Sequence, residues 1–270
     1  MRMLLLIGLM IVTLFTLVSG KIYWDDRIER VQAKGQTAHE DFNTGGDSHE
    51  EAEGKKNVDV VTLDKLNLLP KEIQSLFRLK VGQGQSVNLA IVGSASASKT
   101  EKTWSHLLER KLVDTYGASV IKITTKEIAN KTSTQVISEK LLDGLAASKP
   151  DILLIEPFLL YDNTKLPMDD RLKNLSTIIE QFKSFNSDVT VMIQPSNPIY
   201  QAHYYPKEEK ELEKYAYTHG YTYLDHWKAW PSGESNQLLS YLTGGGLPND
   251  KGNEVWARYI EDYFIQKAVD

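Results

Sequence analysis

The chain has 270 residues, of which 41% are hydrophobic and 25% are charged, so it is long enough to bury one sizeable core and to carry appendages. Its formal net charge is −5 and no basic cluster stands out, which argues against nucleic acid as the main partner. It contains no cysteine, which excludes disulfide bonds, thiolate catalysis and zinc sites built from cysteine. We expect neither a metal ion nor a cofactor.

The chain begins with an apolar segment. Residues 3–18 are apolar or nearly so and follow Arg2, which is typical of a secretory signal or a membrane anchor. The run is shorter than the roughly 20 residues that span a bilayer, but further apolar and aromatic residues extend it to position 24. We expect residues 1–24 to anchor the protein in the cell membrane, with an extracytoplasmic domain. Secretion after cleavage near residues 18–20 and a buried helix of a soluble protein are the alternatives.

A polar stretch separates this segment from the rest. Residues 34–57 hold four glycines and an acidic patch, and such a composition buries too little apolar surface to order itself. We expect residues 25–60 to form a flexible tether off the membrane, whose two histidines have no fixed partners for a metal ion. Apolar residues at helical spacing then predict one or two lead-in helices over residues 61–86. The main domain is expected to span residues 87–270.

The stretch VNLAIVGSASAS, from Val87 to Ser98, organises this domain. Its apolar first half is typical of a strand buried on both faces, as in a parallel sheet. The run ends at Gly93, and small residues follow before a helical pattern. A strand, a loop and a helix in this order place the loop at the carboxyl end of a strand, where open α/β sheets bind ligands.

Strands and helices alternate from Val87 onward. Gly117 and Gly220 are helix C-terminal signals, and Pro206 is a helix N-terminal signal. Five strands alternating with five helices predict a three-layer α/β/α sandwich with a mostly parallel sheet. The strands are expected at 87–92, 119–125, 151–156, 189–194 and 221–225, and the helices at 103–116, 134–147, 168–185, 206–219 and 249–268.

The loops after the strands resemble those of the SGNH (GDSL-type) hydrolases, which are flavodoxin-like esterases and acyl-hydrolases. The resemblance covers residues 87–268 and is most specific in LPNDKGNEVWARYI, which looks like the family's closing motif followed by its last helix. The stretches IEPFLLYDN and DHWKAWP are similar to those of bacterial, surface-anchored members. The resemblance implies a flavodoxin-like sheet of five parallel strands in the order 2-1-3-4-5, with the strand 87–92 away from the edges.

The resemblance fails where the family's chemistry should be. The nucleophilic serine of the first motif falls on Ala95, and the aspartate and histidine base of the last motif fall on Gly244 and Leu247. The asparagine that helps to hold the oxyanion falls on Tyr161. A serine needs a positioned base, and loss of one triad member leaves only the roughly 10³–10⁴-fold catalysis that comes from the oxyanion hole and binding.

Other residues offer two sets of site candidates. Ser94 and Ser96 flank Ala95, and either could act as a nucleophile with His203 as its base. The alternative is that the serines make turn and cap hydrogen bonds and that His203, like His226, is an ordinary polar loop residue.

Tyr161, Asp162 and Asn163 are the candidates for ligand binding, and the alternative is that Asp162 and Asn163 cap their loop. Aromatic residues near the expected cleft favour a sugar-like ligand because rings stack on apolar sugar faces, although Trp227 is better explained by packing. These aromatic residues are Tyr161, Tyr200, Tyr204, Tyr205, Trp227 and Trp230.

Three functions remain open. The first is a catalytically degenerate, extracytoplasmic SGNH-like protein that binds a cell-envelope glycan or a partner protein. The second is an active esterase or deacylase of cell-surface carbohydrate that uses non-standard residues. The third is a structural subunit of an envelope machine. The residues at Ala95, Gly244 and Leu247 favour the first over the second.

Overall fold

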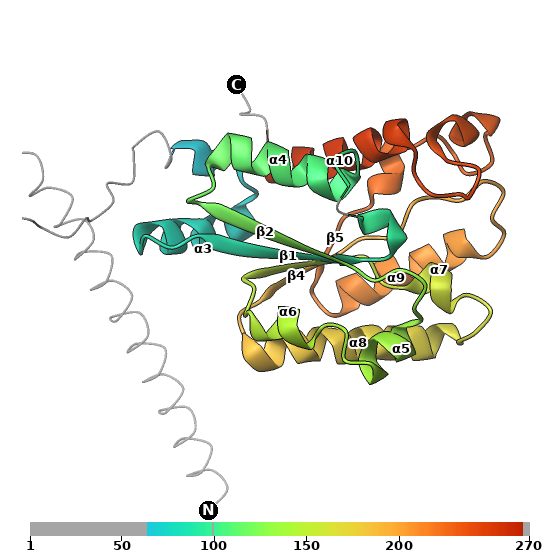
Figure 1. Cartoon of the computed structure of the whole chain (residues 1–270), viewed down its shortest axis with the longest axis horizontal. Helices are drawn as coiled ribbons and strands as arrows, with labels where there is room; N and C mark the ends of the chain where they lie inside the picture. Colours follow the sequence, from blue (N-terminus) through green and yellow to red (C-terminus); the bar gives the residue numbers. More distant parts are fainter. Residues whose placement is uncertain (1–63, 99, 267–270) are drawn as a thin grey trace, which may run out of the picture. The chain divides into compact units, whose positions relative to one another are not determined.

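The computed structural model describes residues 64–98 and 100–266, which contain a five-stranded parallel sheet in the order β2-β1-β3-β4-β5 (Figure 1). This order confirms the expected topology, and β1 lies inside the sheet. Ala90 of β1 has Thr124 of β2 on one side and Leu153 of β3 on the other. The strands are β1 (Val87–Gly93), β2 (Ile121–Glu127), β3 (Ile152–Ile155), β4 (Thr190–Ile193) and β5 (Thr222–Tyr223).

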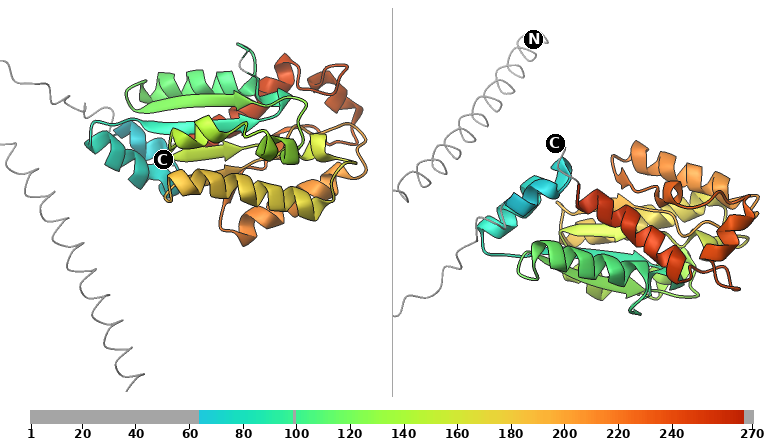
Figure 2. Two further views of the ribbon diagram at one scale, coloured as in Figure 1. Left: turned by 60° about the horizontal axis from the view of Figure 1, so that its bottom comes forward. Right: turned by 90° about the horizontal axis from the view of Figure 1, so that it is seen from above.

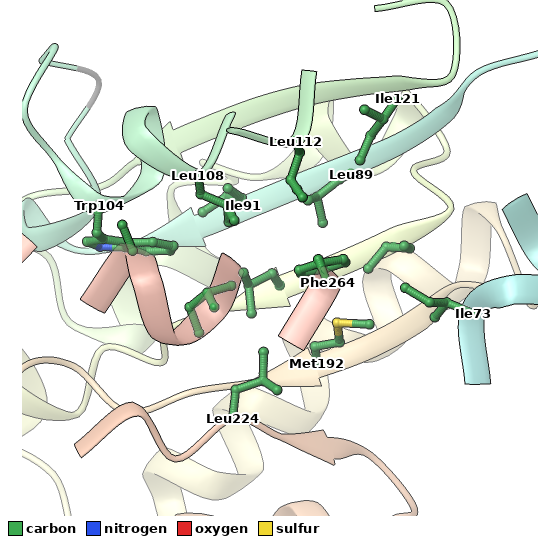
Figure 3. Close-up of a cluster of buried hydrophobic side chains, with 14 of the residues drawn as sticks. Ile73, Leu89, Ile91, Trp104, Leu108, Leu112, Ile121, Met192, Leu224 and Phe264 are labelled. Carbon is green, nitrogen blue, oxygen red and sulfur yellow. The ribbon is translucent and has the colours of Figure 1, made fainter. Parts of the chain in front are cut away.

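Helices cover both faces of the sheet and make three layers (Figures 1 and 2). Successive residues of a strand point to opposite faces, so Leu89 and Ile91 of β1 enter one core cluster, while Ala90 and Val92 enter the other. Figure 3 shows the first cluster, in which Leu89 and Ile91 meet side chains of the helices on that face. That face carries α4 (Trp104–Tyr116) and α10 (Asp250–Phe264), and the other carries α5 (Ser133–Ser138), α6 (Asp143–Ala147), α8 (Met168–Phe185) and α9 (Tyr205–Thr218).

The helix boundaries follow most of the sequence signals. The residue after α4 is Gly117, whose φ of 96° is in the left-handed region that favours glycine. Pro206 lies in the first turn of α9. The expectation of one helix over residues 134–147 is wrong, because the chain forms α5 and α6 there. Lys140 lies between them with a φ of 54°, which interrupts the helical backbone.

The lead-in residues pack into the main core. Phe77 and Val81 of α3 (Lys71–Gly82) are buried in the same cluster as β1, as is Leu66 of the short helix η1 (Leu66–Leu68). Lys80 of α3 forms an ion pair of 2.7 Å with Asp151, just before β3. The lead-in helices and the sheet therefore share one hydrophobic core.

The expected anchor at residues 1–24 and the expected tether at residues 25–60 lie outside the described residues. Among the residues that are described, no helix has both the length and the apolar character needed to cross a membrane.

Three aromatic rings form a buried stack beneath the carboxyl ends of the strands. The imidazole of His226 stacks on Trp256 at 4.0 Å between ring centroids, and Trp256 stacks on Trp104 at 4.8 Å. Trp230 Nε1 donates a hydrogen bond to His226 Nδ1. Because an indole N–H only donates, Nδ1 carries no proton, and Nε2–H donates to the Pro195 carbonyl at 3.0 Å. The interpretation of His226 as an ordinary polar loop residue is therefore wrong.

Burial lowers the pKa of His226 to about 3, against 6.5 for an exposed histidine. Between these two values the unfolded chain binds a proton that the folded chain does not, so acid favours the unfolded state. We expect the wild type to lose about 2 kcal/mol more unfolding free energy than His226→Gln between near pH 7 and about pH 4.5. Urea unfolding of both proteins at both pH values measures this difference.

The comparison with His226→Gln is needed because other groups titrate in the same range. Burial raises the pKa values of Glu156, Asp162 and Glu209, so these carboxyl groups act in the opposite direction, but they do so in both proteins. Equal losses in the wild type and the variant contradict a buried neutral imidazole.

Candidate functional site

The carboxyl edge of the sheet carries an open pocket of about 650 Å³. Its walls come from the loop after β1, which holds the short helix η2 (Ala95–Ala97), and from the loop before α10. Ala95 and Leu247, the residues on which the resemblance puts the family's nucleophile and base, both line this pocket. The other lining residues are Ser96, Ser98, Thr100, Lys102, Thr103, Thr243, Pro248, Asn249, Asp250, Lys251 and Asn253.

Hydrogen bonds fix the loop that presents Leu247. Thr243 N–H donates to the Leu247 carbonyl at 2.7 Å, and Gly246 N–H donates to the Thr243 carbonyl at 2.9 Å. Asn197, in the loop after β4, donates its Nδ2 to the Gly246 carbonyl at 2.9 Å. Gly246 has a φ of 78°, which favours glycine at this turn. Hydrogen bonds within the loop and one from Asn197 therefore hold this loop in place. The side chain of Leu247 is exposed.

The first turns of α4 and α10 meet beside the pocket. Asn253 Oδ1 accepts a hydrogen bond from Trp104 N–H at 3.0 Å and so connects the two helices. On the rim, Lys102 Nζ lies 2.6 Å from Asp250 Oδ2, and Lys251 Nζ lies above the ring of Tyr241, 4.0 Å from its centroid. Two lysines and one aspartate give the rim a small excess of positive charge.

Glu156, directly after β3, is the partner of both serines that were candidate nucleophiles. Its carboxyl group is fully buried. Ser94 Oγ donates to Oε1 at 2.7 Å, and Ser96 Oγ donates to Oε2 at 2.5 Å. Burial raises the pKa of Glu156, and the hydroxyl groups of Ser96 and Ser94 lower it in part.

Gly93 allows this close approach of β1 and β3. A Cβ atom at this position would lie 2.7 Å from Glu156 Oε2 and 2.7 Å from the Cβ of Ala97, so no larger residue fits without a shift of the backbone. From the sequence, Glu156 was expected only as the last residue of a strand. The signal that could have revealed its role is a carboxylate at the end of the run DILLIE, on the strand next to Gly93 and its serines.

Two further polar side chains lie beside this carboxyl group. The hydroxyl group of Ser196 lowers the pKa of Glu156 together with those of Ser96 and Ser94, and Tyr205 is fully buried near its charge. Burial raises the pKa of Tyr205 well above its usual range, and the nearby charge of Glu156 raises it further. Because Ser96 both lines the pocket and bonds Glu156, it connects the pocket to this buried polar cluster.

His203 lies apart from the serines. It is an exposed residue of the loop between β4 and α9, and it does not line the pocket. In the described part of the chain no hydrogen bond joins His203 to Ser94 or Ser96, whose hydroxyl groups donate to Glu156. The structure therefore brings the two serines together with a carboxyl group rather than with an imidazole.

The three candidate ligand-binding residues lie at the end of α7 (Leu159–Asp162), and none of them lines the pocket. Asp162 is 1% exposed, and its Oδ1 accepts a hydrogen bond of 2.7 Å from Ser133 N–H at the start of α5. Beside it lies a cavity of about 10 Å³, which has room for about one water molecule. Asp162 therefore connects α7 to α5. Tyr161 and Asn163 are half-buried beside it.

The aromatic residues expected near the cleft do not line the pocket either. Trp227 Nε1 donates to the Ser196 carbonyl at 2.7 Å, and its ring packs edge-on against Tyr205, which confirms that Trp227 has a packing role. Trp230 is buried and bonds His226. Most of the residues that line the pocket have polar side chains, although apolar atoms contribute more of its surface than polar atoms do. Within residues 64–98 and 100–266, no cluster of three histidine or acidic side chains is arranged to hold a metal ion.

No protein-family model matches the sequence. No curated protein matches it either. Solved structures do match, and each of the following covers about two thirds of this chain.

A lipolytic protein of the G-D-S-L family from Desulfitobacterium hafniense DCB-2 is 16% identical, with a TM-score of 0.54 over 66% of this chain and 100% of its own. A carbohydrate esterase of family 3 from Talaromyces cellulolyticus is 13% identical, with a TM-score of 0.55 over 65% of this chain and 95% of its own. The esterase EstA from Pseudoalteromonas is 18% identical, with a TM-score of 0.51 over 65% and 95%. At these identities the likeness concerns the fold, and the described chain has the fold of SGNH/GDSL-type lipases and esterases.

Proposed function

We propose that this chain is an SGNH-like binding protein that holds a polar, hydroxyl-rich ligand in the pocket at the carboxyl edge of its sheet. In this proposal the Ser-His-Asp chemistry of the resembled family is lost. The observation that carries the proposal is that Ala95 and Leu247 line the same pocket. The fold keeps a cavity where the resemblance puts the reactive groups, but the side chains at both positions are hydrocarbon.

Neither position supports a triad. Alanine has no oxygen to attack an ester, and leucine accepts no proton. The neighbouring hydroxyl groups of Ser94 and Ser96 donate to Glu156, which is buried behind them. A substrate in the pocket therefore meets no imidazole that could move a proton to its leaving group.

The pocket wall supports a saccharide as the class of ligand. The hydroxyl groups of Ser98, Thr100 and Thr243 can both donate and accept hydrogen bonds, as sugar hydroxyl groups do. A volume of about 650 Å³ lies within the usual range of small-molecule pockets. Two of the structurally similar proteins are a carbohydrate esterase and an acetyl xylan esterase. We therefore favour a cell-envelope glycan over a partner protein.

The proposal includes a place in the cell. In this proposal, residues 1–24 anchor the chain in the cell membrane and residues 25–60 form a tether. The domain that carries the pocket then lies on the extracytoplasmic side of the membrane. This part rests on the apolar run at the start of the sequence.

Ester hydrolysis separates this proposal from an active esterase. We expect the full chain to show no turnover of p-nitrophenyl acetate above background, and Ala95→Ser alone to stay inactive because the base is still missing. Ala95→Ser combined with Gly244→Asp and Leu247→His is expected to regain a trace of activity. A Cβ atom at Gly244 meets nothing within 4 Å, so the aspartate fits sterically. Robust turnover by the wild type contradicts the proposal.

Filling the pocket tests ligand binding. Leu247 and Leu239 are exposed leucines, at 41% and 52%, but only Leu247 lines the pocket. We expect Leu247→Trp to weaken the binding of acetylated oligosaccharides to the full chain by at least about tenfold, because the indole occupies the cavity. Leu239→Trp is the matched control and is expected to bind as the wild type does. Isothermal titration calorimetry measures both affinities, and equal affinities place the ligand elsewhere.

A further inference from the structure

We infer that Ser96 is a nucleophile of the pocket with Glu156 as its base, and that it takes up one acyl or phosphonyl group from a reactive ester without releasing it again. The inference deepens the proposed function and rests on it, because the same pocket must admit the ester. The resembled family's nucleophile position is Ala95, so the step uses a different residue.

The geometry separates Ser96 from its neighbour. Both serine hydroxyl groups donate to Glu156, but of these two residues only Ser96 lines the pocket. Ser96 Oγ lies 2.5 Å from Glu156 Oε2, which is the hydrogen-bond contact that a nucleophile needs with its base. Ser94 Oγ is bonded to the other carboxylate oxygen and also lies 3.1 Å from Ser96 Oγ.

The atoms of the step balance within this contact. Ser96 Oγ forms a bond to the carbonyl carbon of the ester, and the bond from that carbon to the leaving oxygen breaks. The proton of the Ser96 hydroxyl passes to Glu156 Oε2. With a fluorophosphonate the new bond is to phosphorus, and fluoride leaves. Burial raises the pKa of Glu156, which makes its carboxylate a stronger base than an exposed one.

The second half of a hydrolase cycle has no base. Release of the acyl group needs a base that activates water on the pocket side of the ester. Glu156 is fully buried and does not line the pocket, and the resemblance puts Leu247 at the family's base position. The acyl group therefore stays on Ser96, and a single covalent event is compatible with the absence of turnover.

Labelling of the full chain with a fluorophosphonate probe tests the inference. Intact mass spectrometry and peptide mapping are expected to show one adduct per chain, on Ser96, and none on Ser96 in heat-denatured protein. Ser96→Ala is expected to abolish the adduct, and Glu156→Gln to slow its formation by at least about tenfold. Ser148→Ala, which changes an exposed serine away from the pocket, is expected to label as the wild type does.

An adduct on another residue, no adduct, or labelling of Ser96 that is indifferent to Glu156→Gln overturns the inference. If Glu156→Gln does not fold, the labelling of Ser96 is compared between native and heat-denatured wild type. Equal labelling in both overturns the inference, because it shows that the folded structure does not activate Ser96. Oligosaccharide binding without an adduct overturns this inference alone. An adduct on Ser96 without oligosaccharide binding overturns the proposed saccharide ligand but supports Ser96 as the nucleophile.

Discussion

The buried carboxyl group of Glu156 is the constraint on which the site depends. A carboxylate without water is costly unless hydrogen bonds compensate its burial, and here Ser94 and Ser96 provide them. The same contact demands glycine at position 93, because a side chain there collides with the carboxylate. Contact with Glu156 therefore explains why glycine and two serines occupy positions 93, 94 and 96. The loop that carries them forms one wall of the pocket.

The opposite wall depends on contacts of a different kind. The loop before α10 is held by its own backbone hydrogen bonds and by Asn197, which bonds the Gly246 carbonyl. The stack of His226, Trp256 and Trp104 holds α10 and α4 together beneath it. Buried groups therefore hold both of the loops that form the pocket.

The sequence predicted the sheet well because its strands are apolar runs followed by clear helix signals. Gly117 marked the end of α4, and the strand order followed from the resemblance to known hydrolases. The break between α5 and α6 was missed because Lys140 is neither glycine nor proline, and its left-handed backbone leaves no mark in the sequence.

The site was predicted only in part. The resemblance placed Ala95 and Leu247 in two loops, and the structure brings these loops to one pocket. Glu156 was missed because it lies 60 residues from Ser96 in the sequence, and only the pairing of β1 with β3 brings the two together. His203 has a suitable side chain, but its loop leaves it exposed and away from the serines. Periodicity and composition carry no information on such distances.

The most direct test of the account is a crystal structure of the protein with a bound acetylated oligosaccharide. We expect ligand density between Ala95 and Leu247, with sugar hydroxyl groups bonded to the serine and threonine side chains of the pocket wall. Density over the exposed aromatic surface at Tyr204, with the pocket empty, contradicts it.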